Sequence, residues 1–319
     1  MARRFNGYVT GGTTMEKTIV SEIDPQYLRR LNWYGAKPIA ATLLTLPVIG
    51  RAIRHAANAI LPARIVHRLP ISDHHTNYLP IAAEPIRLLD PLHDSVAKNI
   101  YWGRGQPTSP ADALVLRLVE KLAPEISTFA DVGSYSALFA LVAARCNPTA
   151  HAVAYDIVPE NYAMMVSNIE ANGLSDRVKA KLLGLSDAAG TIIMPARTDT
   201  LGKPSAISIG STFKSGIEVP LTTLDAEGLS GPLMMKLDVE TYEWAVLQGG
   251  RATVERLLPT IVCEILPRFK HCEEMSAWLK SLGYRFFLAT DTGFTEYDVL
   301  ALESSRRDWV LTVNDLPQI

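Results

Sequence analysis

Hydrophobic and polar positions alternate regularly from residue 109 to the end of the chain. Short apolar runs typical of buried strands are separated by longer segments whose apolar positions recur at helical spacing. This alternation predicts an α/β fold, a Rossmann-like and mainly parallel sheet with helices on both faces. The predicted strands are 128–132, 151–155, 178–184, 233–237, 260–265, 284–288 and 308–313, the predicted helices are 110–122, 136–146, 159–172, 242–249 and 271–282, and 191–194 with 217–221 form a predicted hairpin.

The part before residue 94 lacks this regular alternation of predicted strands and helices. Residues 25 to about 62 predict short helices, because prolines interrupt the apolar pattern three times. A proline-punctuated connector follows, in which Asp73-His74-His75 is interpreted as a solvated loop. We therefore divide the chain into an N-terminal helical and basic segment with its connector, residues 1–93, and a Rossmann-like domain, residues 94–319.

Basic residues concentrate in this N-terminal segment. Residues 25–71 contain seven Lys or Arg and no Asp or Glu, and within them 48–61 places its isoleucines on one helical face. One interpretation is a basic amphipathic helix on an anionic membrane surface. The other is a helical cap whose apolar face packs on the main domain. The sequence leaves both open.

Composition narrows the possible partners and compartments. Hydrophobic residues make up 48% of the 319 positions and charged residues 20%, as in globular proteins, and the net charge of −2 does not favour a nucleic-acid partner. The three cysteines form no C-x-x-C pair, so no structural zinc site is expected, and no apolar run has the length of a membrane span. We also find no signal-peptide pattern, and expect a cytoplasmic protein.

Acidic residues follow several of the predicted strands. In parallel α/β sheets ligands bind outside the carboxyl ends of the strands. The loop after strand 128–132 begins with an acid and holds one glycine, and the chain has no glycine-rich phosphate loop, so a pyrophosphate ligand is disfavoured and a cationic sulfonium suits the site. The candidate cofactor-binding residues of this loop are Asp131, Gly133, Ser134 and Tyr135.

The ends of the next two strands extend the candidate site. Asp156 ends the second strand, followed by Ile157, and a carboxylate there can accept hydrogen bonds from both hydroxyls of a ribose. Ser186 and Asp187 follow the third strand, where they can accept from an exocyclic adenine amine. Each acid taken alone can equally be a helix cap. Their joint placement at three strand ends favours a ligand site.

Four sequence blocks resemble the FkbM family of methyltransferases, over about residues 94–284. The most specific block, spanning 219–264, joins a Thr-Thr-Leu-Asp turn to a Lys-Leu-Asp-Val-Glu strand end and a later strand that ends in Glu. The blocks are Phe129–Ser134, Ala154–Tyr162, Leu185–Gly190 and Val219–Glu264.

The resemblance implies a class I methyltransferase sheet that binds S-adenosylmethionine. It also implies O-methylation of a hydroxyl on a small-molecule or glycan acceptor, such as a carbohydrate, glycolipid or secondary metabolite. This sequence departs from the family in having Ala137 and Thr241 in place of glycines, and Asp156 in place of a glutamate. These departures leave open a catalytically weakened scaffold, with peripheral membrane contact through residues 25–71. A nucleotide-dependent oxidoreductase fits worst.

Candidate catalytic groups cluster at the end of strand 233–237. Asp238 and Glu240 are candidate bases for an acceptor hydroxyl, Lys236 can tune a neighbouring carboxylate, and Glu243 lies one helical turn from Glu240. The alternative is a structural cluster of ion pairs and caps. Tyr101-Trp102-Gly103-Arg104-Gly105 is interpreted as an aromatic and basic loop that either covers the site or packs on the first helix.

Overall fold

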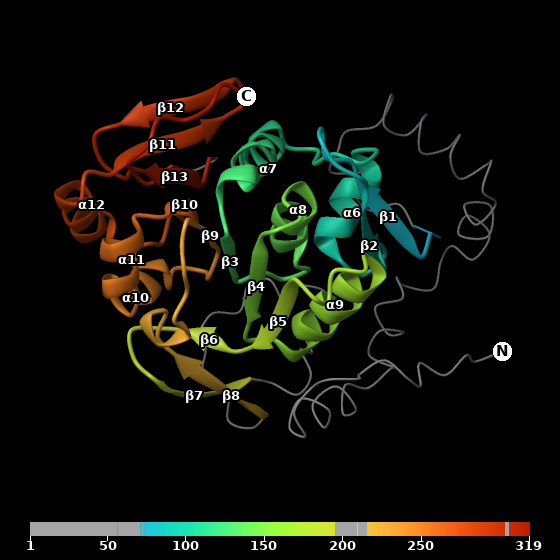
Figure 1. Ribbon diagram of the computed structural model, residues 1–319, viewed down its shortest axis with the longest axis horizontal. Helices are drawn as coiled ribbons and strands as arrows, with labels where there is room; N and C mark the ends of the chain where they lie inside the picture. The colour runs from blue at the N-terminus through green and yellow to red at the C-terminus, as the bar shows by residue number, and fades with distance from the viewer. Residues whose placement is uncertain (1–55, 57–70, 72, 195–208, 210–215, 304–305) are drawn as a thin grey trace.

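The computed structural model describes residues 56, 71, 73–194, 209, 216–303 and 306–319 (Figure 1). Nearly all of the basic segment 25–71 and of the loop between the predicted hairpin strands lies outside these residues. The predicted helices of the N-terminal segment are therefore not tested, and the boundary after residue 93 stays a prediction.

An eight-stranded sheet forms the centre of the described structure. Its strands β5, β4, β3, β9 and β10 lie side by side in parallel, and β13, β11 and β12 extend it in antiparallel pairing. Strand β3 is fully buried, as a central strand covered on both faces must be. The bounds are β3 Thr128–Val132, β4 His151–Asp156, β5 Val178–Leu182, β9 Leu233–Leu237, β10 Thr260–Glu264, β11 Arg285–Thr290, β12 Gly293–Tyr297 and β13 Asp308–Thr312.

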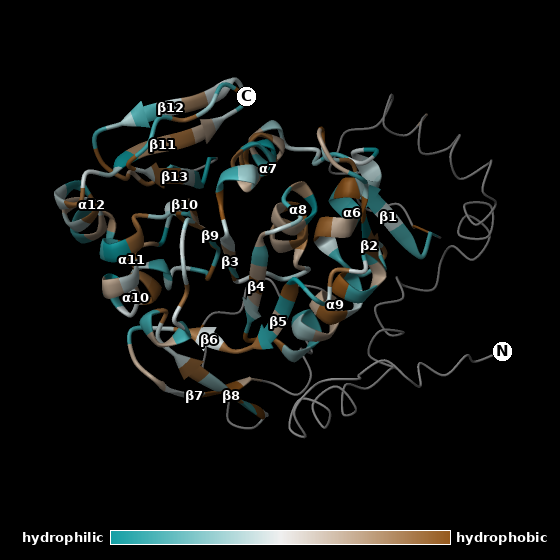
Figure 2. Ribbon diagram, viewed as in Figure 1, coloured by the Kyte–Doolittle hydropathy of each residue, from teal (hydrophilic) through white to brown (hydrophobic). Residues whose placement is uncertain are grey.

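Helices cover both faces of this sheet, which confirms the predicted α/β, Rossmann-like class. One buried cluster joins the sheet to α7, α8 and α9, and a second joins its other face to α10, α11 and α12. Figure 2 shows hydrophobic segments on α6 and α8, next to the first cluster. The helices are α6 Ser95–Trp102, α7 Pro110–Leu122, α8 Leu138–Cys146, α9 Pro159–Ala171, α10 Glu243–Gln248, α11 Arg251–Leu257 and α12 Cys272–Ser281.

Two small sheets accompany the large one. The predicted hairpin is confirmed: β7 pairs antiparallel with β8, which also pairs with β6. Where the sequence indicated a connector, β1 and β2 form a hairpin, and buried Asn168 of α9 fastens it by accepting from the Leu89 backbone N–H at 2.9 Å. The bounds are β1 His75–Tyr78, β2 Ile86–Leu89, β6 Gly184–Leu185, β7 Gly190–Met194 and β8 Ile217–Thr222.

The expected loop at 101–105 is wrong for its first two residues. Tyr101 and Trp102 are the last, buried residues of α6, which begins after Asp94 because the Asp94 carboxylate accepts from the Ala97 N–H at 2.7 Å. Helix α11 and strand β12 were not predicted either. Both are short and half exposed, so they carry little hydrophobic periodicity.

The described residues contain no helix that combines the length and the apolarity needed to cross a bilayer.

Candidate functional site

The strand order reverses at β3 and β9, and a cleft opens where these strands end. The chain runs from β3 outward to β4 and β5 and then returns to β9 on the other side of β3. Val132 pairs with Leu237, so the next residues, Gly133 and Asp238, lie side by side. A Cβ on Gly133 would lie 1.8 Å from the Asp238 carbonyl oxygen, and its φ is +76°. Only glycine permits this close approach of the two loops.

The cleft encloses about 590 Å³ between protein atoms, part of it open to solvent. Four of the predicted cofactor-binding residues line it, and so do two of the candidate catalytic residues. The lining residues from the predicted set are Gly133, Tyr135, Asp156, Ile157, Asp238 and Glu240. Its other walls, which the prediction did not include, come from Val132, Tyr155, Asn161, Leu183, Gly184, Leu185, Ile209 and Val239. Of these, Gly184 carried a readable signal, a glycine at a strand end.

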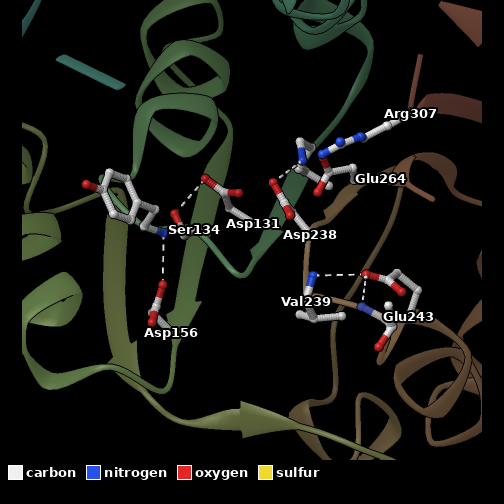
Figure 3. A network of polar contacts seen from close by, with 11 residues as sticks. Asp131, Ser134, Asp156, Asp238, Val239, Glu243, Glu264 and Arg307 are labelled. Carbon is white, nitrogen blue, oxygen red and sulfur yellow. Dashed lines mark hydrogen bonds and ion pairs between the residues drawn. The ribbon is translucent and has the colours of Figure 1, made fainter. Parts of the chain in front are cut away.

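Asp131 of β3 and Ser134 of the β3–α8 loop are buried, and neither is among the residues that line the cleft. The Asp131 carboxylate accepts from the Ser134 hydroxyl at 2.7 Å (Figure 3). It also accepts from the Ala140 N–H at 3.1 Å. Burial raises the pKa of Asp131 to about 6, although these hydrogen bonds and Lys236 act to lower it. In this structure the carboxylate thus joins the loop to the first turn of α8.

Asp156 lies in the cleft, and its carboxylate also organises the cleft. It accepts from the backbone N–H of Tyr135 at 3.0 Å (Figure 3). It also accepts from the backbone N–H of Val158 at 2.8 Å, and the Asn161 amide lies 3.1–3.2 Å from both oxygens. Burial raises its pKa to about 6, against the lowering effect of those hydrogen bonds. One side chain therefore fixes the cofactor loop to the end of β4 while facing the ligand space.

Ser186 and Asp187 are not among the lining residues. The Ser186 hydroxyl donates to the Asp187 carboxylate at 3.0 Å, and Asp187 is exposed. The backbone of Ser186 packs against Gly249, where a Cβ would lie 2.0 Å from the Ser186 carbonyl oxygen. The structure therefore shows a packing role for this segment, and its predicted contact with adenine stays a prediction.

Glu243 supports the loop that follows β9 and does not line the cleft. One carboxylate oxygen accepts from the N–H groups of Val239 at 3.1 Å and Thr241 at 3.2 Å (Figure 3). The side chain is fully buried, its other oxygen has no hydrogen-bond partner, and burial raises its pKa to about 7. Glu240 forms an ion pair with Arg268. The pKa of Glu240 is raised, mainly by burial and to a smaller extent by the negative charge of Asp238.

Asp238 and Lys236 form the most buried charged pair of the site. The Lys236 ammonium lies 3.0 Å from an Asp238 oxygen, and Glu264 hydrogen-bonds to the same carboxylate. Burial acts to raise the pKa of Asp238, but Lys236 and these hydrogen bonds hold it below its usual value. Burial, followed by the Asp238 charge, raises the pKa of Glu264 to about 9. At neutral pH Asp238 is therefore ionised and Glu264 protonated.

Four residues beside the cleft have left-handed backbone conformations although none is glycine. Tyr135 has φ +55° and Ala137 +65° in the cofactor loop, and Glu240 has +57° and Thr241 +82° after β9. The left-handed Ala137 is the N-cap of α8, which explains why this helix starts later than predicted. Such conformations cost energy and persist where the surroundings enforce them.

The chemistry of the cleft fits S-adenosylmethionine. Its charged lining residues are all acids, Asp156, Asp238 and Glu240, which suits a cationic sulfonium and opposes a pyrophosphate. Asp156 lines the cleft, and its predicted contact with ribose hydroxyls stays a prediction. Gly133 and Gly184 open the space: a Cβ on Gly184 would lie 2.9 Å from the Ile157 side chain.

Comparison with known proteins agrees with this chemistry. Residues 129–286 match the sequence profile of the methyltransferase FkbM domain. No curated protein matches the chain.

The chain also resembles solved methyltransferase structures. A crystal structure of methyltransferase FkbM from Methylobacillus flagellatus KT is 10% identical with a TM-score of 0.43, over 84% of this chain. This chain spans 60% of that protein's length. Precorrin-6y C5,15-methyltransferase from Geobacter metallireducens GS-15 is 12% identical, with a TM-score of 0.35, over 63% of this chain and 87% of the other. The B. subtilis M1A22 tRNA methyltransferase TrmK is 14% identical, with a TM-score of 0.34, over 63% and 65%.

The profile match spans the cofactor loop, the ribose-side strand end and the Lys236–Glu264 region. Residues 129–286 are therefore a methyltransferase domain of the FkbM family, whose cofactor is S-adenosylmethionine.

Proposed function

We propose that this protein is an O-methyltransferase that acts on a hydroxyl of a carbohydrate, a glycolipid or a secondary metabolite. The observation that carries the proposal is the position of Asp238, which lines the cleft and whose carboxylate lies 3.0 Å from the Lys236 ammonium. When bound, S-adenosylmethionine supplies an electrophilic methyl carbon. A hydroxyl is a weak nucleophile and needs a group that takes its proton.

Asp238 is suited to that proton transfer although its pKa is low. The hydroxyl hydrogen becomes strongly acidic as the oxygen gains its new bond to carbon, so a carboxylate with a lowered pKa is a sufficient acceptor. Lys236 keeps the carboxylate ionised and oriented. Glu243 acts on the same loop from below, through the N–H groups of Val239 and Thr241.

Cofactor binding is the first test. Titration calorimetry should detect binding of S-adenosylmethionine to the wild type, and Asp156→Asn should weaken it about tenfold or more, because an amide cannot accept all the hydrogen bonds that this carboxylate accepts. Asp176→Asn, at an exposed turn before β5, is the matched control and should bind like the wild type. Asp187→Asn asks separately whether the predicted adenine contact exists.

Turnover is the second test. S-adenosylhomocysteine release is measured with a panel of hydroxyl acceptors at saturating S-adenosylmethionine, and Asp238→Asn should reduce it strongly under these conditions, where a loss of cofactor affinity no longer limits the rate. A wild type that binds no cofactor would contradict the proposal. A wild type that binds cofactor and methylates no acceptor would favour the alternative of a non-catalytic scaffold. Contact of residues 25–71 with a membrane stays a prediction, tested by cosedimentation with anionic liposomes.

A further inference from the structure

A second pocket lies on the other side of Asp238 from the cofactor cleft. Helices α6, α7 and α8 form one side of it, and the ends of β9, β10 and β13 form the other. It encloses about 690 Å³ between protein atoms, part of it open to solvent. Its helix side is mainly apolar: α6, α7 and α8 contribute the polar residues Asn99 and Asp112 and the apolar residues Val96, Ile100, Val115, Leu116, Leu138 and Phe139.

Asp238 lines both the pocket and the cleft. A group that reaches Asp238 through the second pocket therefore meets the carboxylate that also faces the cofactor space. Lys236 belongs to the second pocket, where its ammonium lies 5.4 Å from the centre of the Phe139 ring. The charged pair and the apolar wall thus meet in one place.

The polar side of the pocket carries excess negative charge. Lys236 is its cation, and it faces Asp112, Asp238, Asp308 and Glu264. Burial raises the pKa of Asp308 to about 6 and that of Glu264 to about 9. At neutral pH Asp308 is therefore largely ionised and Glu264 is not, and the carboxylates of Asp238 and Asp308 outweigh the one ammonium. An anionic ligand is repelled by this field, and Lys236 is the one cation among the described residues that line the pocket.

The two carboxyl groups of Glu264 and Asp238 hold one proton between them at neutral pH. Two carboxylates cannot hydrogen-bond to each other unless one carries a hydrogen, and Lys236 stabilises the charge on Asp238. Arg307 lies 3.9 Å from Glu264 and favours the ionised form, but it is half exposed and this contact is weak (Figure 3). The proton therefore resides on Glu264, whose O–H donates to Asp238.

We propose that the second pocket binds the methyl acceptor, an uncharged molecule with an apolar body and a hydroxyl, and that Glu264 is the positioning residue that orients Asp238 toward that hydroxyl. This rests on the proposed function. In the step, the acceptor oxygen forms the new bond to the methyl carbon, the carbon–sulfur bond breaks with its electron pair left on sulfur, and the hydroxyl proton passes to Asp238. Glu264 keeps its own proton.

The pocket is tested with a pair of probes that differ in charge. Octyl β-D-glucoside has an apolar chain and neutral hydroxyls, and octyl β-D-glucuronide adds a carboxylate. Saturation-transfer NMR below the micellar concentration should show that the wild type binds the glucoside about tenfold or more tightly than the glucuronide. Asp308→Asn should reduce this preference several-fold, because it removes one of the repelling charges.

Val96→Trp blocks the pocket from α6 at a half-buried position, and it should abolish glucoside binding while affinity for S-adenosylhomocysteine stays unchanged. Equal affinity for the two probes, no binding of the glucoside to the wild type, or glucoside binding that survives Val96→Trp would overturn the pocket assignment. Loss of S-adenosylhomocysteine binding in the wild type would instead contradict the proposed function.

The role of Glu264 is tested by difference infrared spectroscopy. At pH 8, above the pKa values of about 6 to 7 of Asp131, Asp156, Asp308 and Glu243, the wild type should keep a protonated-carboxyl band that is strongly reduced in Glu264→Gln and is lost on titration through a pH of about 9. Glu296→Gln, an exposed carboxylate paired with Arg285, is the control and should keep the band. Glu264→Gln retains a donor toward Asp238, so it should keep more turnover than Glu264→Ala at equal cofactor affinity. A spectrum unaffected by Glu264→Gln, or equal turnover of the two variants, would overturn the assignment.

Discussion

Thr241 has the most unfavourable backbone conformation among the residues around the cleft, and Thr241→Gly should stabilise the protein. Its φ is +82°, a region in which a β-branched residue is a true outlier. The preceding residue, Glu240, has φ +57°, so the loop after β9 makes two left-handed steps in succession. Glycine adopts this region without a steric penalty.

The expected gain follows from two opposing terms. A left-handed conformation costs an L-residue about 1–2 kcal/mol, which glycine avoids. Glycine loses more backbone entropy on folding, about 0.5–1 kcal/mol, which offsets part of the gain. The hydrogen bond from the residue-241 N–H to Glu243 is a backbone bond and survives the change. The net stabilisation should be about 0.5–1 kcal/mol, equivalent to a rise in Tm of about 1–4 °C.

Urea denaturation measures the change, with Thr241→Ala as the matched control. Alanine removes the branched side chain but keeps the Cβ that clashes in the left-handed region, so it should gain little. The transition midpoint of Thr241→Gly should exceed that of Thr241→Ala while the slope m stays constant. A glycine variant no more stable than the alanine variant would refute the reasoning, because backbone strain at φ +82° would then contribute nothing.

Three further predictions concern the same region. Ala137→Gly should change the free energy of unfolding by less than about 1 kcal/mol, since the relief of backbone strain at φ +65° is offset by the loss of a fully buried methyl group. A large gain in urea denaturation would contradict this balance. The folded-state pKa of Glu243, about 7, lies above its unfolded value, so its contribution to stability is complete below about pH 4.5 and is lost as pH rises through about 7. In a pH series of unfolding midpoints, the midpoint of Glu243→Gln should therefore fall less over this range than that of the wild type. Parallel curves for the two proteins would refute this prediction. Asn168→Ala should lower the free energy of unfolding by about 2–4 kcal/mol, because it leaves the Leu89 N–H and the Ser136 carbonyl without their buried partner. Calorimetric unfolding measures the loss, with Ser167→Ala as an exposed control. A loss no larger than that of the control would contradict the prediction.

Most of the central sheet was predictable because its strands are uniform. Strands β3 and β9 have the predicted bounds, since every residue in them is buried and most are apolar. Helix α7 also begins as predicted, with the Ser109 side chain accepting from the Asp112 N–H. Local chemistry and burial agree at these places, so the pattern alone suffices.

The candidate site was less predictable because side chains of the same type have different roles in it, which depend on where each one lies in three dimensions. Asp131 and Glu243 have the residue types of a ligand site, yet the Asp131 carboxylate accepts from the Ala140 N–H in α8 and the Glu243 carboxylate accepts from N–H groups of the loop after β9. Sequence spacing does not distinguish an acid that faces a cleft from one that supports its wall. The second pocket depends on α6, and α6 depends on the Asp94 cap and on two aromatic residues that resemble a loop motif.

Ala137 and Thr241 now have a physical interpretation. The family resemblance places glycine at both positions, and the sequence alone left open a weakened cofactor site. In the structure both residues keep the left-handed backbone that glycine would adopt, and the residues lining the cleft include neither of them. Their cost is therefore backbone strain, which lowers stability, while the positions of Gly133, Asp156 and Asp238 are maintained. Thr241→Gly separates the two effects: if unfolding shifts while cofactor affinity does not, the departure from glycine reduces stability and leaves the site intact.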